Sequence, residues 1–277
     1  MVPPPVTRLG SLAASAGERL VTPLALAIDE ISVQRRTVAE VEHRPWPLPA
    51  RPRLMGQTWY HLLFAHWPVE PSVIDRLLPS PLRAQRRDGS AWLGITPFAV
   101  AALRLRGTAP LPWLSWFPEL NVRTYVEVDG KPGIYFFSLD AARRTAVDAA
   151  RRSYQLPYFR ARMRVQQIGT EIRYESERID RSGPSAGFRT RYRPAGPCTD
   201  DPLGRWLAER YCLYVVDSRR RVLRGEIHHQ PWPLQPADAE FERNEMAGPL
   251  GIQLSDGPVL HYSARQDTLI WALAPAR

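Results

Sequence analysis

One segment of the sequence, RGEIHHQPWPLQPA, combines residue types that could carry out proton or metal chemistry. It runs from Arg224 to Ala237 and places one carboxylate, Glu226, close to the adjacent histidines His228 and His229. Side chains alternate between the two faces of a strand, so Glu226 and His228 would share one face and His229 the other. Glu226 could then hold His228 by a carboxylate–imidazole contact, which fixes the tautomer that a general base or a metal ligand needs.

The same alternation argues against a metal site in this segment. Adjacent His228 and His229 point to opposite sides of a regular strand, so they cannot both bind one ion. A catalytic zinc site needs three protein ligands, and the other candidates, His61, His66 and His261, stand at no diagnostic spacing. We therefore expect no metal. A structural role, in which the two adjacent histidines hydrogen-bond the proline-rich loop that follows, stays open beside the acid–base role.

A second polar group lies in the segment ELNVRTYV, which is typical of a strand. Asn121, Arg123 and Tyr125 share one face of that strand. An arginine that faces the inside of a barrel would be a clamp for a carboxylate or another anion. Glu119, two residues before Asn121, is the natural ion partner of Arg123. The alternative is a solvated strand face with a surface ion pair, which contributes little to stability.

These segments belong to a region rich in predicted strands, which begins at residue 55. Asp129 with Gly130 and, further on, Gly169 predict two hairpin turns. Short helices are expected at PSVIDRLLPSPL, at DAARRTAVDAARRSY, where Asp140 can act as N-cap, and at DPLGRWLAERY. About ten strands with so few helices predict a mainly β (α+β) domain whose sheet closes into a barrel with a few peripheral helices.

Residues 1–54 differ in composition from the remainder. MVPPPVTRLGSLAASAGERL is rich in Pro, Ala and Ser, and EHRPWPLPARPRL is interrupted repeatedly by proline. Both compositions are typical of segments without a core of their own. We therefore expect an N-terminal extension over residues 1–54, partly disordered and loosely attached, followed by one barrel domain over residues 55–277.

Charge and composition narrow the range of partners. The formal net charge is +9, but of the 37 basic residues only Lys131 is lysine, and the arginines are scattered along the chain. No zinc-finger or RNA-binding motif accompanies them, and no apolar run approaches the ~20 residues that a membrane helix needs. The first residues show no basic segment followed by an apolar run, so we expect no secretory signal, and the two cysteines form no CxxC pair. We expect a cytoplasmic protein without nucleic-acid or membrane partners; a homo-oligomer stays open.

Several longer phrases carry a family resemblance. QTWYHLLFAHWPV, DGSAWLGITPF, LPYFRARM, ERYCLY and RGEIHHQPWPLQPA together resemble the YqjF-like family, in the same order from about residue 55 to 275. That family has no established activity. More distantly, DGKPGIYFFSLDAARRTAVDAARRSYQLPYFRAR is similar to acetoacetate decarboxylase. This resemblance implies a closed, cone-like β-barrel with a pocket in its middle, next to the turn at residues 156–158.

The resemblance places Tyr158 where acetoacetate decarboxylase has its Schiff-base lysine. A phenol cannot form an imine with a carbonyl substrate, and Lys131 lies in a DGKPG turn that we expect to be exposed. We therefore exclude Schiff-base decarboxylation. Tyr158 could instead polarise a carbonyl as a hydrogen-bond donor or general acid. The alternative is a core tyrosine whose hydroxyl bonds the backbone.

Two functions of different class follow. In the first, the barrel pocket binds a small acidic or carbonyl-bearing organic molecule. Its ligand-binding residues would be Arg123, Glu119, Asn121, Tyr158 and His229. No cofactor is expected for either function.

In the second, the protein is an acid–base enzyme acting on such a molecule by enolisation, hydration or cyclisation. Its catalytic residues would be Tyr158, His228 and Glu226. The positions of His228 and Glu226 distinguish the two functions. If Glu226 and His228 face the barrel interior within reach of Tyr158, the enzyme interpretation gains support, and if they face outward it loses support.

Overall fold

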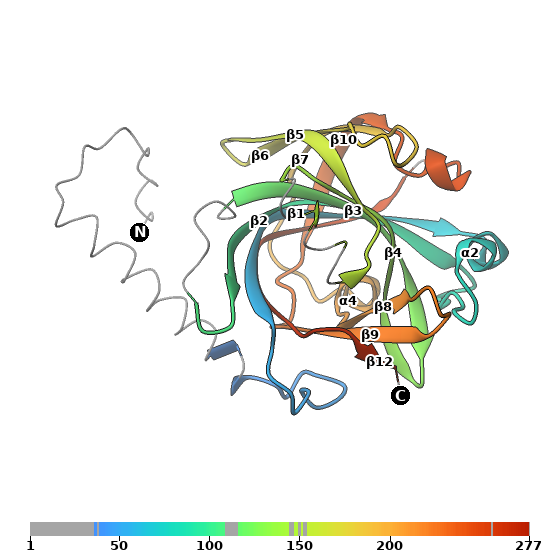
Figure 1. Ribbon diagram of the computed structural model, residues 1–277. Coiled ribbons are helices and arrows are strands. Elements are labelled where there is room, and N and C mark those ends of the chain that lie inside the picture. Colours follow the sequence, from blue (N-terminus) through green and yellow to red (C-terminus); the bar gives the residue numbers. More distant parts are fainter. Residues whose placement is uncertain are drawn as a thin grey trace.

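The computed structural model shows a strand-built fold in which one curved sheet closes on itself (Figure 1). The structure describes residues 36–37, 39–108, 116–143, 147–148, 151, 154–255 and 257–276. The strands are β1 (Met55–Val69), β2 (Ala91–Leu105), β3 (Trp116–Val128), β4 (Lys131–Ala141), β5 (Tyr158–Ile168), β6 (Glu171–Arg178), β7 (Gly187–Pro194), β8 (Cys212–Val216), β9 (Val222–His229), β10 (Gln235–Asn244), β11 (Val259–Ile270) and β12 (Ala274–Pro275). The described helices are α2 (Pro71–Leu77), α4 (Pro202–Ala208) and the 3-10 helix η2 (Gly248–Leu250).

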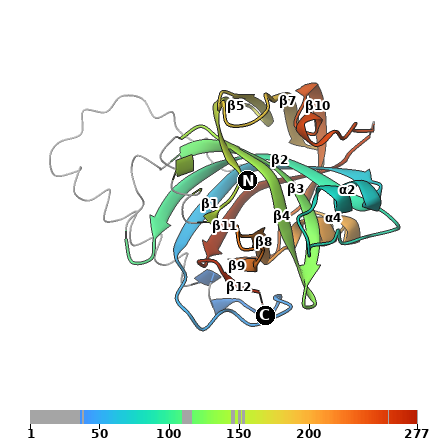
Figure 2. The ribbon, with the colours of Figure 1, turned by 45° about the vertical axis from the view of Figure 1, so that its right-hand side comes forward.

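Strands β11, β1, β2, β3 and β4, hydrogen-bonded in this order, form a common wall between two closed rings. On one side β8 and β9 complete the first ring, because β8 pairs with β4 and β9 pairs with β11. On the other side β10, β7, β6 and β5 complete the second ring, since β10 pairs with β11 and β5 with β4. Figures 1 and 2 show β5, β7 and β10 on one side of the common wall and β8 and β9 on the other. The predicted closed β-barrel with a few peripheral helices is confirmed.

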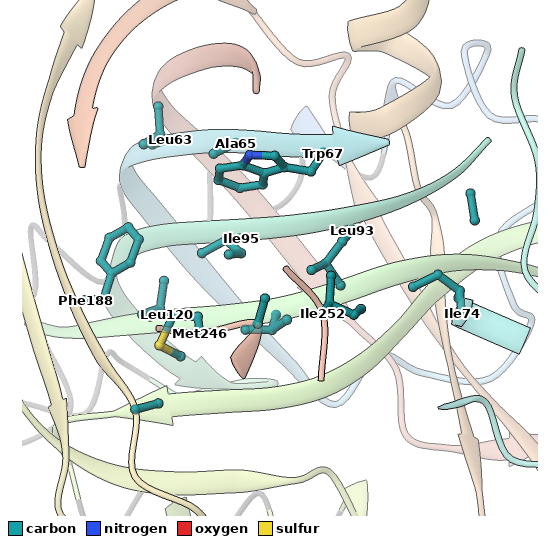
Figure 3. Packing of buried hydrophobic residues seen from close by; sticks show 14 of the residues in the cluster. Leu63, Ala65, Trp67, Ile74, Leu93, Ile95, Leu120, Phe188, Met246 and Ile252 are labelled. Carbon is teal, nitrogen blue, oxygen red and sulfur yellow. The ribbon is translucent and has the colours of Figure 1, made fainter. Parts of the chain in front are cut away.

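The two faces of the common wall have different roles. Leu120 and Val122 of β3 point into the second ring, where they belong to the same buried core as Ile95 of β2 and Phe188 of β7 (Figure 3). The alternate residues of β3 point into the first ring. Burial of apolar side chains stabilises a fold by about 25 cal/mol per Å². Packing in the second ring therefore stabilises the shared strands, and the opposite face of these strands carries the polar residues of the first ring.

Turn chemistry explains the tight connections. Asp129 and Gly130 join β3 to β4 with φ of 53° and 70°, the left-handed pair that a two-residue hairpin requires. Gly169, with φ of 62°, joins β5 to β6. Both predicted hairpins are confirmed, as are the helices α2 and α4. In α4, the Asp201 side chain caps the helix by accepting hydrogen bonds from its first backbone N–H groups.

The helix predicted over residues 140–154 lies largely outside the described residues. Its expected N-cap, Asp140, is a buried residue of β4 whose carboxylate pairs with Arg178 of β6. The prediction that Asp140 caps a helix is therefore wrong, because this residue forms an ion pair between two strands instead.

Residues 39–54 lie against the barrel. The Arg44 side chain donates to the carbonyl of Ile227 at 2.7 Å and to Glu226 at 3.2 Å. Trp46 Nε1 donates to the same Glu226 carboxylate at 2.8 Å, and Trp271 Nε1 donates to the Arg51 carbonyl at 2.8 Å. The prediction of a loosely attached extension is wrong for this part of it, because buried polar contacts hold the segment to β9.

Substitution of Arg44 by alanine is expected to lower the free energy of unfolding by about 2 kcal/mol, measured by urea denaturation. The Arg44 side chain is only 1% exposed, but Glu226 keeps a second guanidinium partner, Arg224, at 2.8 Å. The loss therefore stays below that of a fully unpaired buried charge. Arg86→Ala, at an ion-paired site on the surface, is the control; equal losses in both variants would contradict a buried anchor at Arg44.

Candidate functional site

A cavity of about 390 Å³ occupies the first ring, a size typical of small-molecule sites. Most of its wall is apolar, with side chains from β1, β2, β3, β4, β8, β9 and β11. Its polar lining residues are Gln57, Thr96, Glu119, Asn121, Arg123, Tyr154, Tyr158, Arg210 and His229.

Two buried guanidinium groups lie in this cavity wall. Arg123 is 6% exposed and donates from Nε to the Tyr125 hydroxyl at 3.3 Å, while its Nη2 has no hydrogen-bond partner. Arg210 is 2% exposed and donates from Nη1 to Gln85 at 2.6 Å, while its Nε and Nη2 have none. Within the described residues neither arginine forms an ion pair with a carboxylate.

The two arginines are also electrostatically coupled. The Tyr125 ring lies 5.8 Å from the Arg123 guanidinium and 4.8 Å from that of Arg210. Burial lowers the pKa of Arg210 to about 10, and the nearby positive charge of Arg123 contributes to the same shift. Arg210 still carries its charge at neutral pH. This end of the cavity therefore holds two guanidinium groups with unpaired N–H donors.

Other buried polar atoms of the same wall lack partners too. Thr96 Oγ1 of β2, Asn121 Oδ1 of β3 and Trp232 Nε1 have no hydrogen bond. Thr96 and Asn121 are direct cross-strand neighbours. Because buried polar atoms in folded proteins are nearly always hydrogen-bonded, so many unpaired donors and acceptors around one cavity indicate a place for a polar ligand group.

A third polar feature is the pair formed by Glu119 and Tyr158. The Tyr158 hydroxyl donates to Glu119 Oε2 at 3.1 Å, and Glu119 is 7% exposed. Burial raises the pKa of Glu119 to about 8, although the hydrogen bond from Tyr158 opposes the shift. Burial also raises the pKa of Tyr158 well above its ordinary value. At neutral pH the pair is therefore predominantly uncharged.

The predicted ion pair between Glu119 and Arg123 is wrong. The Glu119 carboxyl bonds Tyr158, and no ion pair joins it to Arg123. The two residues share a face of β3 but are four positions apart, which is about 13 Å of extended strand. The alternative for Tyr158, a hydroxyl bonded to the backbone, is likewise not what the structure shows.

His229 lines the cavity, but its ring nitrogens lie close to backbone carbonyl groups of neighbouring residues. Its Nδ1 lies 2.7 Å from the Gln230 carbonyl and its Nε2 lies 3.3 Å from the Arg210 carbonyl. The ring stacks on Tyr211 with centroids 4.7 Å apart. Burial lowers the pKa of His229 to about 4, so the ring is neutral at physiological pH. Through its contact with the Arg210 backbone, this histidine helps to position that arginine.

Glu226 and His228 do not line the cavity. They lie on the opposite face of β9, beneath the N-terminal segment. His228 Nε2 donates to the Thr37 carbonyl at 2.5 Å, and its Nδ1 lies 3.3 Å from Arg44 Nη1. The predicted Glu226–His228 contact is wrong, because Glu226 bonds Arg44, Trp46 and Arg224 instead. By the criterion set from the sequence, the enzyme interpretation that uses these two residues loses support.

The structure adds Arg210, Thr96 and Trp232 to the residues singled out from the sequence. Arg210 follows α4 in a connecting loop, where no periodicity indicates which way a side chain points. Thr96 could have been noticed as a lone polar residue inside the apolar run AWLGITPFAV. In the part of the chain that the structure describes, no three His, Cys, Asp or Glu residues come together as a metal site. Nor does any described helix have the length and apolar character needed to cross a membrane.

Strands that close around a largely apolar cavity define an acetoacetate-decarboxylase-like barrel. The enduracididine biosynthesis enzyme MppR, solved with HEPES bound, has the same fold, with a TM-score of 0.60 and 12% identity; the match covers 81% of this chain and 88% of MppR. Acetoacetate decarboxylase from Legionella pneumophila gives a TM-score of 0.58 and 10% identity, over 85% of this chain and 93% of that enzyme. At such identities the likeness concerns the fold alone.

Sequence similarity identifies the family to which the chain belongs. It belongs to the DUF2071 family, described as an uncharacterised conserved protein, which it matches over residues 56–267. It is 46% identical over 224 residues to the uncharacterised protein YqjF of Bacillus subtilis, an alignment that covers 79% of this chain and 91% of YqjF. The resemblances to the YqjF-like family and, at the level of the fold, to acetoacetate decarboxylase are thereby confirmed.

Proposed function

We propose that this protein binds a small organic carboxylate in the cavity of the first ring. The carboxylate would lie at Arg123 and Arg210, and the apolar part of the molecule would lie along the strand walls. The observation that carries the proposal is the presence of two buried guanidinium groups with unpaired N–H donors and no carboxylate partner among the described residues.

The physical argument is one of charge and desolvation. A buried cation is unfavourable unless an opposite charge and hydrogen bonds compensate it. A bound carboxylate would supply both, because its two oxygens can accept from guanidinium groups in short, charge-assisted hydrogen bonds. Solved structures of MppR include a complex with pyruvate, itself a carboxylate, which supports a ligand of this class in a barrel of this fold.

A second candidate function is acid–base catalysis on such a molecule by enolisation, hydration or cyclisation. The observation that favours it is the Glu119–Tyr158 pair, because a carboxyl with a pKa of about 8 can give or take a proton near neutral pH. Schiff-base chemistry is not part of this proposal. Tyr158 cannot form an imine, and Lys131 is not among the residues that line the cavity; its Nζ lies 5.9 Å from the Trp46 ring.

The proposed function is tested with decanoate as a probe, by isothermal titration calorimetry. Arg123→Leu is expected to weaken decanoate binding by about 10- to 100-fold, the effect of losing a hydrogen bond to a charged group. Arg193→Leu, which removes a 60% exposed arginine from β7, is the matched control and should bind like the wild type. Unchanged decanoate affinity in both Arg123→Leu and Arg210→Leu would overturn the proposal.

A further inference from the structure

Three of the polar residues that line the cavity form a row along β3. Glu119, Asn121 and Arg123 occupy alternate positions, so all three face the cavity. Each step of two residues advances about 6.6 Å along a strand. The row therefore has a cation at one end, an uncharged carboxylic acid at the other, and an unpaired amide oxygen between them.

The two ends of this row differ in their exposure. Beyond Glu119 the cavity wall continues to Leu54 and Leu105, which are 36% and 44% exposed, so solvent reaches the cavity at this end. Around Arg123 the neighbouring Arg210 and Tyr125 are 2% and 0% exposed. A ligand that pairs with Arg123 thus places its carboxylate at the closed end of the cavity and extends past Glu119 toward the open end.

Glu119, the acid at the open end, has one carboxyl oxygen that can form a further hydrogen bond. Glu119 Oε2 accepts from the Tyr158 hydroxyl, while Oε1 has no hydrogen bond to any described residue. In its protonated form Glu119 can donate to an uncharged oxygen of a ligand. Beside this row the cavity wall is largely hydrocarbon and aromatic, contributed by residues such as Phe98, Phe136 and Ile227.

We propose that the ligand is a medium-chain carboxylic acid that carries a second, uncharged oxygen, a hydroxyl or a ketone, far along the chain from the carboxylate. The carboxylate would bind Arg123 and Arg210, and the distal oxygen would accept a hydrogen bond from Glu119. This inference rests on the proposed function. A short β-oxo acid does not fit it, because one carbon separates its two functional groups and the molecule cannot span the row.

The test compares ω-hydroxydecanoate with decanoate, by calorimetry on the full chain. The wild type is expected to bind the hydroxy acid about tenfold more tightly, the effect of one additional hydrogen bond. Glu119→Leu should abolish this preference while it still binds decanoate. Glu119→Gln retains an N–H donor and should retain the preference. Glu240→Leu, at a 66% exposed position on β10, is the matched control and should keep the wild-type preference.

The outcomes separate the two proposals. Equal affinity of the wild type for both acids would overturn the inference and leave the proposed function standing. A preference that survives in Glu119→Leu would overturn it too, because the distal oxygen would then bind elsewhere. If neither acid binds, the proposed function fails and the inference fails with it.

Discussion

Replacement of Arg178 by methionine is expected to lower the free energy of unfolding at about pH 8 by about 3 to 5 kcal/mol. Arg178 of β6 and Asp140 of β4 form an ion pair whose side chains are 1% and 0% exposed. Nε and Nη2 of Arg178 lie 2.9 Å and 2.8 Å from the same oxygen, Asp140 Oδ1, and Oδ2 has no partner. Without the guanidinium, Asp140 is a buried carboxylate with no counter-charge.

The loss should depend on pH with a definite sign. Burial raises the pKa of Asp140 to about 6, against the opposing effect of Arg178. Below this pH the Asp140 carboxyl is protonated in the folded protein and has no charge for Arg178 to compensate. Arg178→Met is therefore expected to lower the free energy of unfolding by less below this pH than at about pH 8. Urea denaturation at about pH 5 and about pH 8 measures both values, and a larger loss on the acid side would contradict the expectation.

Two further variants test the cause of the loss. Arg193→Met breaks an exposed pair with Asp238, whose side chains are 60% and 59% exposed, and should cost less than about 1 kcal/mol. The double variant Asp140→Leu with Arg178→Met should recover much of the loss, because apolar replacements leave no buried charge. If Arg178→Met costs no more than Arg193→Met, the buried pair does not stabilise the fold.

This ion pair bears on the site as well as on stability. Asp140 lies on the common wall and Arg178 on the second ring, so the pair fixes β6 to β4. Strand β5 lies beside both, and its first residue, Tyr158, is aligned with Leu139 of β4. The position of the Tyr158 hydroxyl against Glu119 thus depends on how firmly the two rings are joined.

Much of the fold could be predicted from the sequence because its signals are local. The strands, the Asp129–Gly130 hairpin and the alternation along β3 follow from residue type and a period of two. Alternation also separated Glu226 and His228 from His229 correctly. It could not tell which face of β9 points into the barrel, because that depends on how the ring closes. Of the three candidate acid–base residues, Tyr158 lines the cavity, whereas Glu226 and His228 lie outside it.

The remaining differences come from contacts between distant parts of the chain. Arg210 reaches the cavity from a loop, where no repeat of apolar residues indicates direction. The proline-rich composition of residues 39–54 is typical of a loose segment. Arg44 and Trp46 nonetheless find partners on β9, about 180 positions later in the chain. Asp140 has the residue type of a helix cap, but its partner Arg178 is brought close only by the folded barrel.

Glu119→Gln is expected to make the protein more stable above neutral pH, by up to about 4 kcal/mol at about pH 8. The pKa of Glu119 rises from its ordinary value of 4.5 to about 8 in the folded protein, chiefly through burial. Between these two values the unfolded chain has Glu119 ionised, whereas the folded protein holds it protonated. Folding therefore takes up a proton, and the wild type loses stability as pH rises across this window.

Glutamine has similar shape, can still accept a hydrogen bond from Tyr158, and has no charge to bury. The two proteins should thus be about equally stable near pH 4.5, and the variant should gain steadily up to about pH 8. Contributions from other titrating groups, Asp140 among them, are common to both proteins and cancel in the difference. Glu42→Gln, at an exposed position, is the control and should track the wild type. A difference between Glu119→Gln and the wild type that does not grow with pH would show that Glu119 is ionised in the folded protein, and would remove the uncharged acid on which recognition of a distal oxygen depends.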